Sequence, residues 1–548
     1  MQGVERGDRE LLDARALVGH LVPEGSMFLF LADHRQDLFS DGEFEDLFPS
    51  GKGRPSIPAS VMASILVLQT LQDFSDRETA DAARCDLRWK VATGMSLDHA
   101  GFDASTLVYW RRRLAKSGRP HRINDAVKAV VEQTGILRGR RKRAVDSTIL
   151  DDAVATQDTV TQLISAIRRV GRQVPGAAEQ IAAVCAGHDY AQPDKPRVDW
   201  DDPDAKDALV SALVNDANAL VGAFIDTDFD EDDAEAAQFA LALLALVAGQ
   251  DVEPAEGSDG TDGRWRIARK VAPDRVVSTV DPDARHTRKS TESRRDGYRA
   301  HVAAEPETGI ITDQKLTKAA GPENSDPAVA EEFLAAENDS ERATGNDSER
   351  AAQDRAGRVG CQWYGDSAYG TGDLRRAIAD TGTDEAVIKP KPVRAPVKGG
   401  FTVDDFTVDE HAGTVGCPAG HVRLINSTRV ATFGALCRDC PLRERCTTAK
   451  TGRKIVLHPQ DTLLRKARRD WAELPELPEK YRMFRPNVER VISQIASRGG
   501  RRLKLRYRGT TKNHAWLTRR TAALNLRNLI SHALTRSAGA WTLAAQTT

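Results

Sequence analysis

The sequence lacks an apolar run long enough to cross a membrane. Its longest apolar stretch, residues 239–248, holds ten residues, whereas a membrane-spanning helix needs roughly 18 or more. The first nine residues are polar and charged, which is not the pattern of a secretory signal peptide. With 40% hydrophobic and 29% charged residues, the composition is typical of soluble globular proteins. We therefore expect a cytoplasmic protein with no membrane partner.

The chain also lacks a strong net charge, since the formal total is only −2. The distribution of charge is uneven, however. Residues 226–235 contain seven acids and no base, whereas residues 481–527 contain thirteen Arg and Lys against one acid, Glu489. A second basic segment, residues 138–143, lies shortly before Asp146. The near-neutral total therefore hides a strongly polarised molecule.

Cysteine is scarce, with seven in 548 residues, and four of these fall within thirty positions. A cytosolic chain seldom forms disulfides, so this clustering indicates metal binding. Cys437 and Cys440 have the spacing that directs two thiolates at one ion, and Cys417 and Cys446 complete a set of four for structural Zn²⁺. His421 could replace one of the four. The alternative is a group of reduced thiols without metal.

The length of the chain, 548 residues, predicts about two to four domains. In a first domain that we delimit as residues 1–135, residues 1–55 show no strong periodicity, whereas residues 56–135 contain several short helical patterns, and Ser75 with Glu78 fits a capping box at the start of one of them. The helix predicted to begin at Ser105 carries three consecutive arginines, residues 111–113. We interpret this region as an all-helical domain that contacts DNA in the manner of a helix-turn-helix module, or else serves packing or dimerisation.

Strand and helix patterns alternate from residue 136 to residue 540, which indicates an α/β domain. We expect three interruptions of this domain, namely an acidic helical insertion at 151–255, a flexible linker at 337–356 and a Cys-rich, zinc-binding insertion at 400–460. The linker contains two copies of Asn-Asp-Ser-Glu-Arg-Ala that begin eight residues apart. A strand is also predicted at residues 275–280.

Three acidic residues lie where metal-dependent phosphodiester chemistry would need them. Asp146 ends one apolar strand pattern, Asp366 ends another, and Glu489 lies in the basic helical segment. Carboxylates that converge from separate elements can bind two Mg²⁺ ions, one activating the attacking oxygen and one stabilising the leaving oxygen. Each acid alone is weak evidence, because an Asp at a strand end is often a turn former. Asp281 and Asp283 are rival candidates for the second aspartate.

The residues around these acids form recognisable motifs. The motifs are Ala144-Val-Asp146-Ser-Thr, Asp281-Pro-Asp-Ala-Arg285 followed by Gly297-Tyr298, Gly365-Asp-Ser-Ala-Tyr-Gly370, and Tyr481-Arg-Met-Phe-Arg485-Pro-Asn-Val-Glu489. In this order they resemble the first-aspartate strand, a further segment, the second-aspartate signature and the third-acid helix of bacterial insertion-sequence DDE transposases. Residues 56–114 are similar to the amino-terminal helical domain of many such enzymes.

The resemblance implies an RNase-H-like core in which the three acids meet at the edge of a mixed sheet. The expected fold is therefore α/β, with an amino-terminal helical domain, a helical insertion and a small zinc-binding insertion. Asp146, Asp366 and Glu489 are implied as catalytic residues and as ligands of two Mg²⁺ or Mn²⁺ ions. The implied activity is cleavage and strand transfer of double-stranded DNA at the ends of an insertion sequence, by a nucleoid-associated homodimer.

The bases around and after Glu489 are candidates for DNA contacts. Arg485 precedes Glu489 by one helical turn on the same face, where it could bind the scissile phosphate or hold Glu489 by an ion pair. Residues 498–508 would place alternate bases on one side if extended, which supplies salt-dependent affinity for DNA. The predicted DNA-binding residues are Arg482, Arg485, Arg490, Arg498, Arg501, Arg502, Lys504, Arg506 and Arg508.

One position departs from the pattern of the family, which commonly has Lys or Arg seven residues after the glutamate. This chain has Ala496 there, and Arg490 or Arg498 could take over the contact with phosphate. Two alternatives to an active transposase therefore stay open. One is a catalytically silent DNA-binding protein of transposase descent, and the other is a metal-dependent nuclease that cuts without strand transfer.

Overall fold

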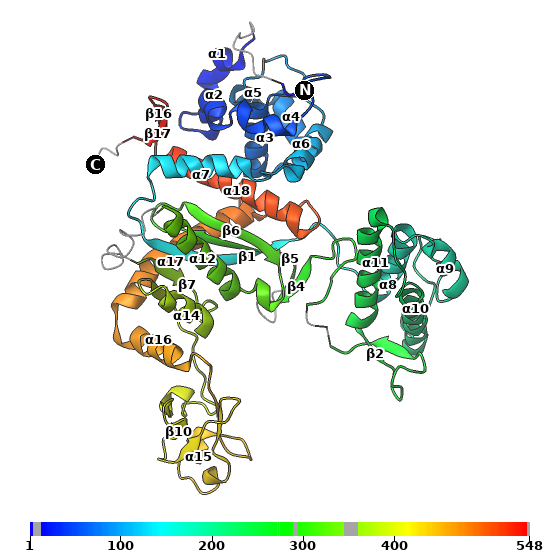
Figure 1. Cartoon of the computed structure of the whole chain (residues 1–548), viewed down its shortest axis with the longest axis vertical. Helices are drawn as coiled ribbons and strands as arrows, with labels where there is room; N and C mark the ends of the chain where they lie inside the picture. The colour runs from blue at the N-terminus through cyan, green and yellow to red at the C-terminus, as the bar shows by residue number, and fades with distance from the viewer. Residues whose placement is uncertain (4–11, 271, 273, 289–293, 345–359, 545–548) are drawn as a thin grey trace.

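The computed structural model of the chain describes residues 1–3, 12–270, 272, 274–288, 294–344 and 360–544. A mixed six-stranded sheet lies at the centre, with the amino-terminal helices beyond one end of it, a helical unit to one side and a small Cys-rich unit at the far end (Figure 1). The predicted α/β architecture with a helical amino-terminal region is confirmed. No helix among the described residues has the length and apolar character that a membrane span requires.

Short helices make up the amino-terminal region. They are α1 (Ala14–Val18), α2 (Met27–Leu38), α3 (Ala59–Gln72), α4 (Asp76–Cys85), α5 (Leu87–Thr93), α6 (Ser105–Lys116) and α7 (Arg122–Thr134). The capping box of Ser75 and Glu78 is present at the start of α4. The apolar side chains of these helices share one core with part of α18 (Thr510–Ser531), including Leu526 and Leu529. The last long helix therefore joins this region to the rest of the protein.

The central sheet is built around β1. Its strands are β1 (Lys142–Asp151), β4 (Arg285–Arg288), β5 (Arg294–Ala304), β6 (Ile311–Lys318), β7 (Gln362–Gly365) and β8 (Glu385–Ile388). The order is β4-β5-β1-β7-β8, and β6 pairs with the second part of β5. β1 pairs antiparallel with β5 and parallel with β7, and β7 pairs parallel with β8. A central strand of this kind has neighbours on both sides and helices on both faces.

Successive residues of β1 point to opposite faces of the sheet. Ala144 packs into the apolar cluster that includes residues of α17 (Glu476–Ala496) and α18, whereas Val145 packs into the cluster of α12 (Asp326–Thr344) and α14 (Gly372–Asp380). Side chains at even positions of β1 therefore face α17. Asp146 is one of them.

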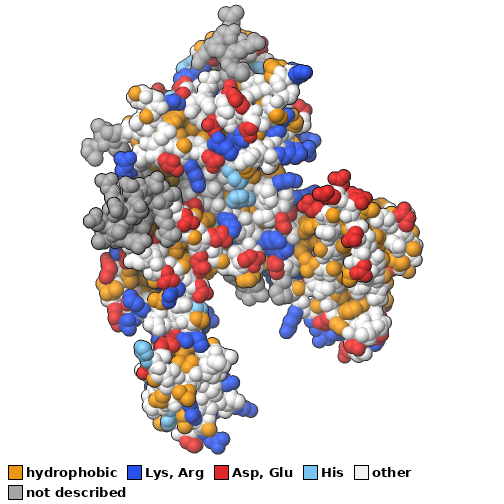
Figure 2. All heavy atoms as spheres, viewed as in Figure 1, with side chains coloured by type: hydrophobic (Ala, Val, Ile, Leu, Met, Phe, Trp, Pro, Cys, Tyr) orange, Lys and Arg blue, Asp and Glu red, His pale blue; other side chains and the backbone are white. Residues whose placement is uncertain are grey.

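The helical unit at the side of the sheet follows β1 directly. It contains α8 (Thr159–Gln173), α9 (Ala177–Val184), α10 (Pro203–Ala223), α11 (Glu231–Gln250) and the short strands β2 (Val252–Pro254) and β3 (Trp265–Ile267). Its helices bury an apolar cluster of their own. Figure 2 shows acidic side chains gathered at the upper end of this unit.

The strand predicted at residues 275–280 is wrong. Only Val276 makes an isolated bridge there, to Arg285. Side-chain amides satisfy the backbone of this segment instead, because Gln250 accepts from the N–H of Val276 and Gln162 donates to its carbonyl. These side-chain contacts take the place of hydrogen bonds to a neighbouring strand. Because they join residues far apart in the sequence, local periodicity does not predict them.

The Cys-rich unit has a core of its own, which contains Phe406, Phe433 and Ile455. Its elements are β9 (Thr407–Asp409), β10 (Thr414–Gly416), β11 (Val422–Leu424), β12 (Val430–Thr432), α15 (Arg443–Cys446) and β13 (Lys454–Val456). The chain then returns to the sheet through α16 (Asp461–Glu473) and α17. It ends with β14 (Ser497–Arg498), β15 (Arg501–Arg502), α18, β16 (Leu534–Ser537) and β17 (Ala540–Leu543).

The linker predicted at 337–356 is wrong in its first part. Residues 337–344 continue helix α12. Glu337 is fixed there by an ion pair with Arg143, whose side chain is only 8% exposed. The second copy of the repeated motif lies outside the described residues.

Candidate active site

Two of the predicted acids lie at the same level of the sheet. β1 and β7 run parallel, and Ala144 pairs with Tyr364. Two residues further along each strand stand Asp146 and Asp366, and a shift of two keeps both on the same face. Asp146 lies within β1 rather than at its end, and Asp366 directly follows β7. Neighbouring strands are about 4.8 Å apart, so these carboxylates are close neighbours.

Glu489 lies on helix α17 and is linked to Asp146 by Arg485 of the same helix. The guanidinium of Arg485 forms an ion pair with Asp146, with Nη2 3.0 Å from Oδ1, and a longer one with Glu489, with Nη1 3.4 Å from Oε1. The Arg485 side chain is 4% exposed, that of Asp146 14% and that of Glu489 66%. Arg485 is therefore a buried cation that joins the first and third predicted acids.

The electrostatics of the site follow from this burial. Burial raises the pKa of the Asp146 carboxyl, and the nearby Asp366 raises it further, while Arg485 opposes the rise. Tyr481 also lies close to the acids, since burial and the charges of Asp366 and Glu489 raise its pKa. The charges of all three acids are therefore concentrated in one small region beside α17.

The turn after β7 explains the motif around Asp366. Oδ1 of Asp366 accepts a hydrogen bond from the N–H of Ala368 at 2.7 Å, as in an Asx turn. A Cβ atom on Gly365 would lie 2.9 Å from Cβ of Tyr369, so this position cannot carry a side chain without displacing that ring. Asp366 is thus both a turn former and a neighbour of Asp146.

A further acid near the site was missed from the sequence. Asp326 opens α12 and accepts a hydrogen bond from the Ser147 hydroxyl at 2.7 Å, next to Asp146 on β1. It also pairs with Arg299 at 3.0 Å. Ser147 points to the opposite face of β1 from Asp146, so Asp326 braces the strand from behind. An aspartate at the start of a helix is common, so the position of Asp326 in the sequence does not predict its contact with Ser147.

The rival aspartates lie elsewhere. Asp281 is fully buried and accepts hydrogen bonds from the hydroxyl of Tyr298 at 2.6 Å and from the N–H of Gly509 at 3.1 Å. Asp283 accepts from the N–H and the hydroxyl of Thr510 and so caps the start of α18. Both tie α18 to the sheet edge.

The donor set of the three acids suits a hard cation, because Mg²⁺ and Mn²⁺ prefer carboxylate oxygens. In the part of the chain that the structure describes, however, no three His, Cys, Asp or Glu side chains are already grouped as a metal site. At the three acids, the reason is Arg485, because its guanidinium lies between Asp146 and Glu489, where a metal ion would bind. The chemistry of these residues therefore fits, and Arg485 would have to give up one contact.

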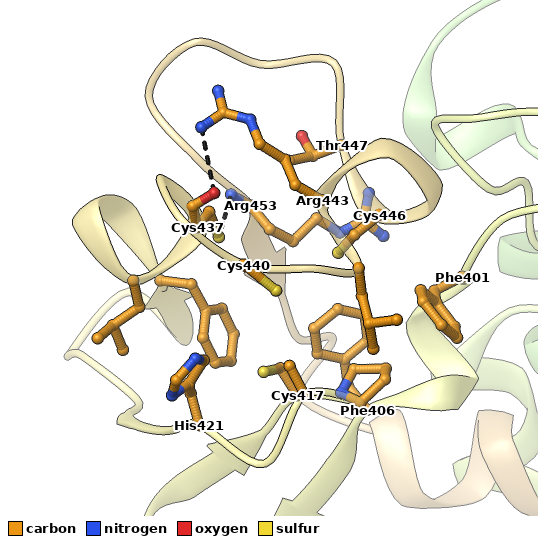
Figure 3. Close-up of a pocket in the computed structure, with 15 residues that line it drawn as sticks. Phe401, Phe406, Cys417, His421, Cys437, Cys440, Arg443, Cys446, Thr447 and Arg453 are labelled. Atoms are coloured by element: carbon orange, nitrogen blue, oxygen red, sulfur yellow. Dashed lines mark hydrogen bonds between the residues drawn. The ribbon is translucent and has the colours of Figure 1, made fainter.

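The four clustered cysteines line one small cavity, together with His421 (Figure 3). Cys437 and Cys446 are 8% and 9% exposed. Burial raises the pKa of the Cys446 thiol, and the thiols of Cys437, Cys417 and Cys440 add to this. The cavity of about 20 Å³ has room for a single water-sized particle. The sulfurs converge without forming a closed metal site.

The basic segment after α17 is a hairpin followed by residues 503–508, in which Lys504 makes an isolated bridge to Asp151. Gly499 and Gly500, with φ of 55° and 76°, form the two-residue turn between β14 and β15, a conformation that favours glycine. Leu503 and Leu505 are buried, whereas the alternate bases of this segment are exposed. The exposed alternate bases are Arg502, Lys504, Arg506 and Arg508, and Arg501 is exposed as well. The alternation predicted for this segment is thus present.

Two of the predicted DNA-binding arginines, both exposed, contact residues at and just after the end of α3. Arg498 donates to the side chain of Gln72 and lies over the ring of Phe74. Arg506 donates to the carbonyl of Asp73 at 2.9 Å and pairs with its carboxylate at 3.5 Å. These side chains connect the site to the end of α3.

The remaining predicted bases differ in their surroundings. Arg482 is exposed and donates to a carbonyl of its own helix, that of Pro478. Arg490 is exposed on α17. Arg501, Arg502, Lys504 and Arg508 have no ion pair or side-chain hydrogen bond to any described residue.

The arginines of α6 are largely used inside the protein. Arg111 pairs with Asp76 at 2.5 Å and lies over the ring of Tyr507. Arg113 lies over the rings of Phe48 and Tyr109. Only the middle arginine of the three is left exposed, so α6 offers little free charge to DNA.

Two protein families match separate parts of the chain. The family described as "Transposase DDE domain" matches residues 423–530, which include Glu489 but neither aspartate. The family described as "Transposase domain (DUF772)" matches residues 18–113. "Uncharacterized protein ORF8 in nfe locus" of Rhizobium meliloti is 29% identical over 107 residues, or 19% of this chain and 51% of its own length. The chain thus spans about half of that relative. No solved structure matches the chain.

Proposed function

We propose that this chain, of which two parts match transposase families, is an insertion-sequence DDE transposase that catalyses metal-dependent cleavage and strand transfer of DNA ends, with Asp146, Asp366 and Glu489 as its catalytic acids. The observation that carries the proposal is the convergence of these acids. Asp146 and Asp366 stand level on adjacent parallel strands, and Arg485 joins Asp146 to Glu489. Charged side chains that converge in this way, one of them with a pKa raised by burial and by a neighbouring carboxylate, mark a candidate functional site.

The arrangement of the sheet supports an RNase-H-like core. Leaving aside β4, the order is β6-β5-β1-β7-β8, with three antiparallel strands followed by two parallel ones. Asp146 then occupies the middle strand and Asp366 the end of its parallel neighbour, while α17 covers that face. These positions of the strands and of α17 support the proposed roles of the three acids.

In this proposal Asp146, Asp366 and Glu489 would hold Mg²⁺ or Mn²⁺, which would supply activation of the attacking oxygen and stabilisation of the leaving oxygen. The chain's own residues position the substrate. Arg485 opposes the rise that burial causes in the pKa of the Asp146 carboxyl, and its guanidinium could bind the scissile phosphate once it is displaced from one carboxylate. Arg501 and Arg502, at the tip of the hairpin, provide sequence-independent contacts to the DNA backbone.

We further propose that Cys417, Cys437, Cys440 and Cys446 bind a structural Zn²⁺. Four thiolates around a cavity for one small particle suit tetrahedral coordination. The apolar core of the unit is small, so that metal binding would add to its stability. In Figure 1 this unit lies away from β1, β7 and α17, the elements that carry or precede the acids, which supports a structural rather than a catalytic role.

The division into an amino-terminal domain, residues 1–135, and a catalytic domain, residues 136–540, with its insertions stays a prediction, as do the homodimer and the nucleoid location. The buried contacts of Arg111 and Arg113 favour packing over DNA reading for the first of these domains. Specificity for element ends would then depend on other surfaces of the complex.

The Asp366→Asn variant tests the proposal. It keeps the size of the side chain and the turn, and we expect unchanged binding to duplex DNA that flanks the reading frame, with loss of Mg²⁺-dependent cleavage. Asp380→Asn, an exposed aspartate on α14, is the control. Cleavage by Asp366→Asn at the wild-type rate would overturn the assignment. Binding without cleavage by the wild type would instead favour a silent DNA-binding protein.

A further inference from the structure

A cleft between α17, α18 and the β5–β6 turn lies outside the group of catalytic acids. Its volume is about 440 Å³, which is within the usual range of ligand-binding clefts. Each helix contributes four residues of one face, and in both helices these residues are three, one and three positions apart. The turn lines the remaining side. The lining residues are Asn487, Arg490, Val491 and Gln494 of α17, Leu524, Arg527, Asn528 and Ser531 of α18, and residues 306–309 of the turn.

The two arginines of this cleft carry charges that the described part of the chain does not neutralise. Neither Arg490 nor Arg527 has an ion pair or a side-chain hydrogen bond to a described residue. Burial lowers the pKa of Arg527. The acid in the lining, Glu307, is engaged by Arg140 and Lys142 at 2.9 Å each. The cleft is therefore positively charged.

The neutral lining residues indicate which anion fits. The amides of Asn487 and Gln494 have no side-chain hydrogen bond to a described residue, so they can donate to a ligand. Asn528 is engaged with the carbonyl of Thr308 at 2.6 Å. No aromatic ring is among the residues that line the cleft, so a nucleobase would have nothing to stack on. Two guanidinium groups and two amides suit the oxygens of a phosphate group.

We propose that this cleft binds a backbone phosphate of duplex DNA at a point outside the catalytic acids. The proposal rests on the proposed function, because it assumes that DNA lies along α17. Arg490 directly follows Glu489, and successive residues of a helix are turned by about 100°. The cleft and the acids therefore lie on neighbouring faces of one helix. A DNA strand that passes the acids and continues around α17 to its neighbouring face reaches the cleft.

The experiment measures binding of a fluorescein-labelled random-sequence duplex to the full-length protein in EDTA, at several salt concentrations. Each phosphate contact contributes about 0.9 to the slope of log affinity against log salt. For Arg490→Gln/Arg527→Gln we expect a slope smaller by about 2 and weaker binding at every salt concentration. The matched control is Arg197→Gln, an exposed arginine in the acidic helical unit, with an unchanged slope.

Three outcomes would overturn parts of this account in different ways. An unchanged slope in the double variant, with normal binding by the wild type, overturns the cleft proposal alone. Absence of DNA binding by the wild type overturns the cleft proposal and the proposed function together. Inorganic phosphate, titrated at constant ionic strength, is the second probe. If phosphate binds the wild type but not the double variant while the DNA slope is unchanged, the cleft takes free phosphate rather than DNA.

The single variant Arg490→Gln keeps the test valid if the double variant does not fold. Arg490 is exposed on the helix surface, so that its replacement is expected to leave the unfolding midpoint within experimental error. Its slope is expected to fall by about 1. A normal slope in this folded variant contradicts the proposal.

Discussion

Replacing Arg485 with methionine is expected to destabilise the packing of α17 on β1. Removal of one partner from a buried ion pair costs about 3–5 kcal/mol, because the other charge stays buried. Asp146 meets this condition, with a side chain only 14% exposed. The contact with Glu489, which is 66% exposed, adds at most about 1 kcal/mol. We expect a total near about 3 kcal/mol, since Asp146 can take up a proton and limit the loss.

The loss should grow with pH. Burial raises the pKa of Asp146, and Arg485 opposes the rise. Below the ordinary aspartate pKa of about 4, a carboxyl whose pKa is raised in the folded state is protonated in both states and costs no stability. As the pH rises through the folded-state pKa, the carboxyl ionises and the fold loses stability. Without Arg485 that pKa rises further. The stability deficit of Arg485→Met is therefore expected to be small near about pH 4 and largest near about pH 7.

Hydrogen exchange of β1 and α17, measured on the full chain in EDTA, reports this local stability. Arg482→Met is the control on the same helix, because Arg482 is exposed and touches only its own helix. The double variant Asp146→Asn/Arg485→Met should recover most of the protection, since it leaves no buried charge unpaired. Wild-type protection in Arg485→Met at neutral pH, or a further loss in the double variant, would refute the reasoning.

Two other predictions concern the periphery of the site. Cys440→Ser is expected to lower the zinc content of protein purified with zinc and to make the Cys-rich unit sensitive to protease, whereas Cys85→Ser, outside the cluster, should change neither; equal zinc in both variants would argue for unliganded thiols. Arg501→Gln/Arg502→Gln should reduce the salt slope of DNA binding by about 2 with unchanged stability. Arg498→Gln should instead lower the stability, because it removes the contact with Gln72 and Phe74, and leave the salt slope unchanged. A lower stability in the double variant and a smaller slope in Arg498→Gln would show that the two roles are misassigned.

The elements that carry the acids could be predicted because their signals are local. The strand around Asp146 and the helix around Glu489 have apolar periodicity, and the turn after Asp366 has its own motif. The sequence also placed Arg485 on the same face as Glu489, and the structure has that contact at 3.4 Å. The pairing of β1 with β7, which brings the aspartates level, depends on chain topology and could not be predicted from spacing.

The contacts that were missed join distant parts of the chain. Arg498 reaches Gln72 across 426 positions, and no local pattern distinguishes a docking arginine from one that binds DNA. Asp326 accepts a hydrogen bond from Ser147 across 179 positions, and no local pattern indicates this contact. Both cases show that charge in a sequence predicts an interaction more readily than it predicts the partner.

The central claim is tested most directly by the products formed from DNA that carries the sequences flanking the reading frame. With Mg²⁺ and a target duplex, the wild-type protein is predicted to give both cut ends and ends joined to the target. Neither product should form with Asp146→Asn, Asp366→Asn or Glu489→Gln. Cut ends without joined products would identify a nuclease, and joined products from any of the three variants would contradict the role of that acid.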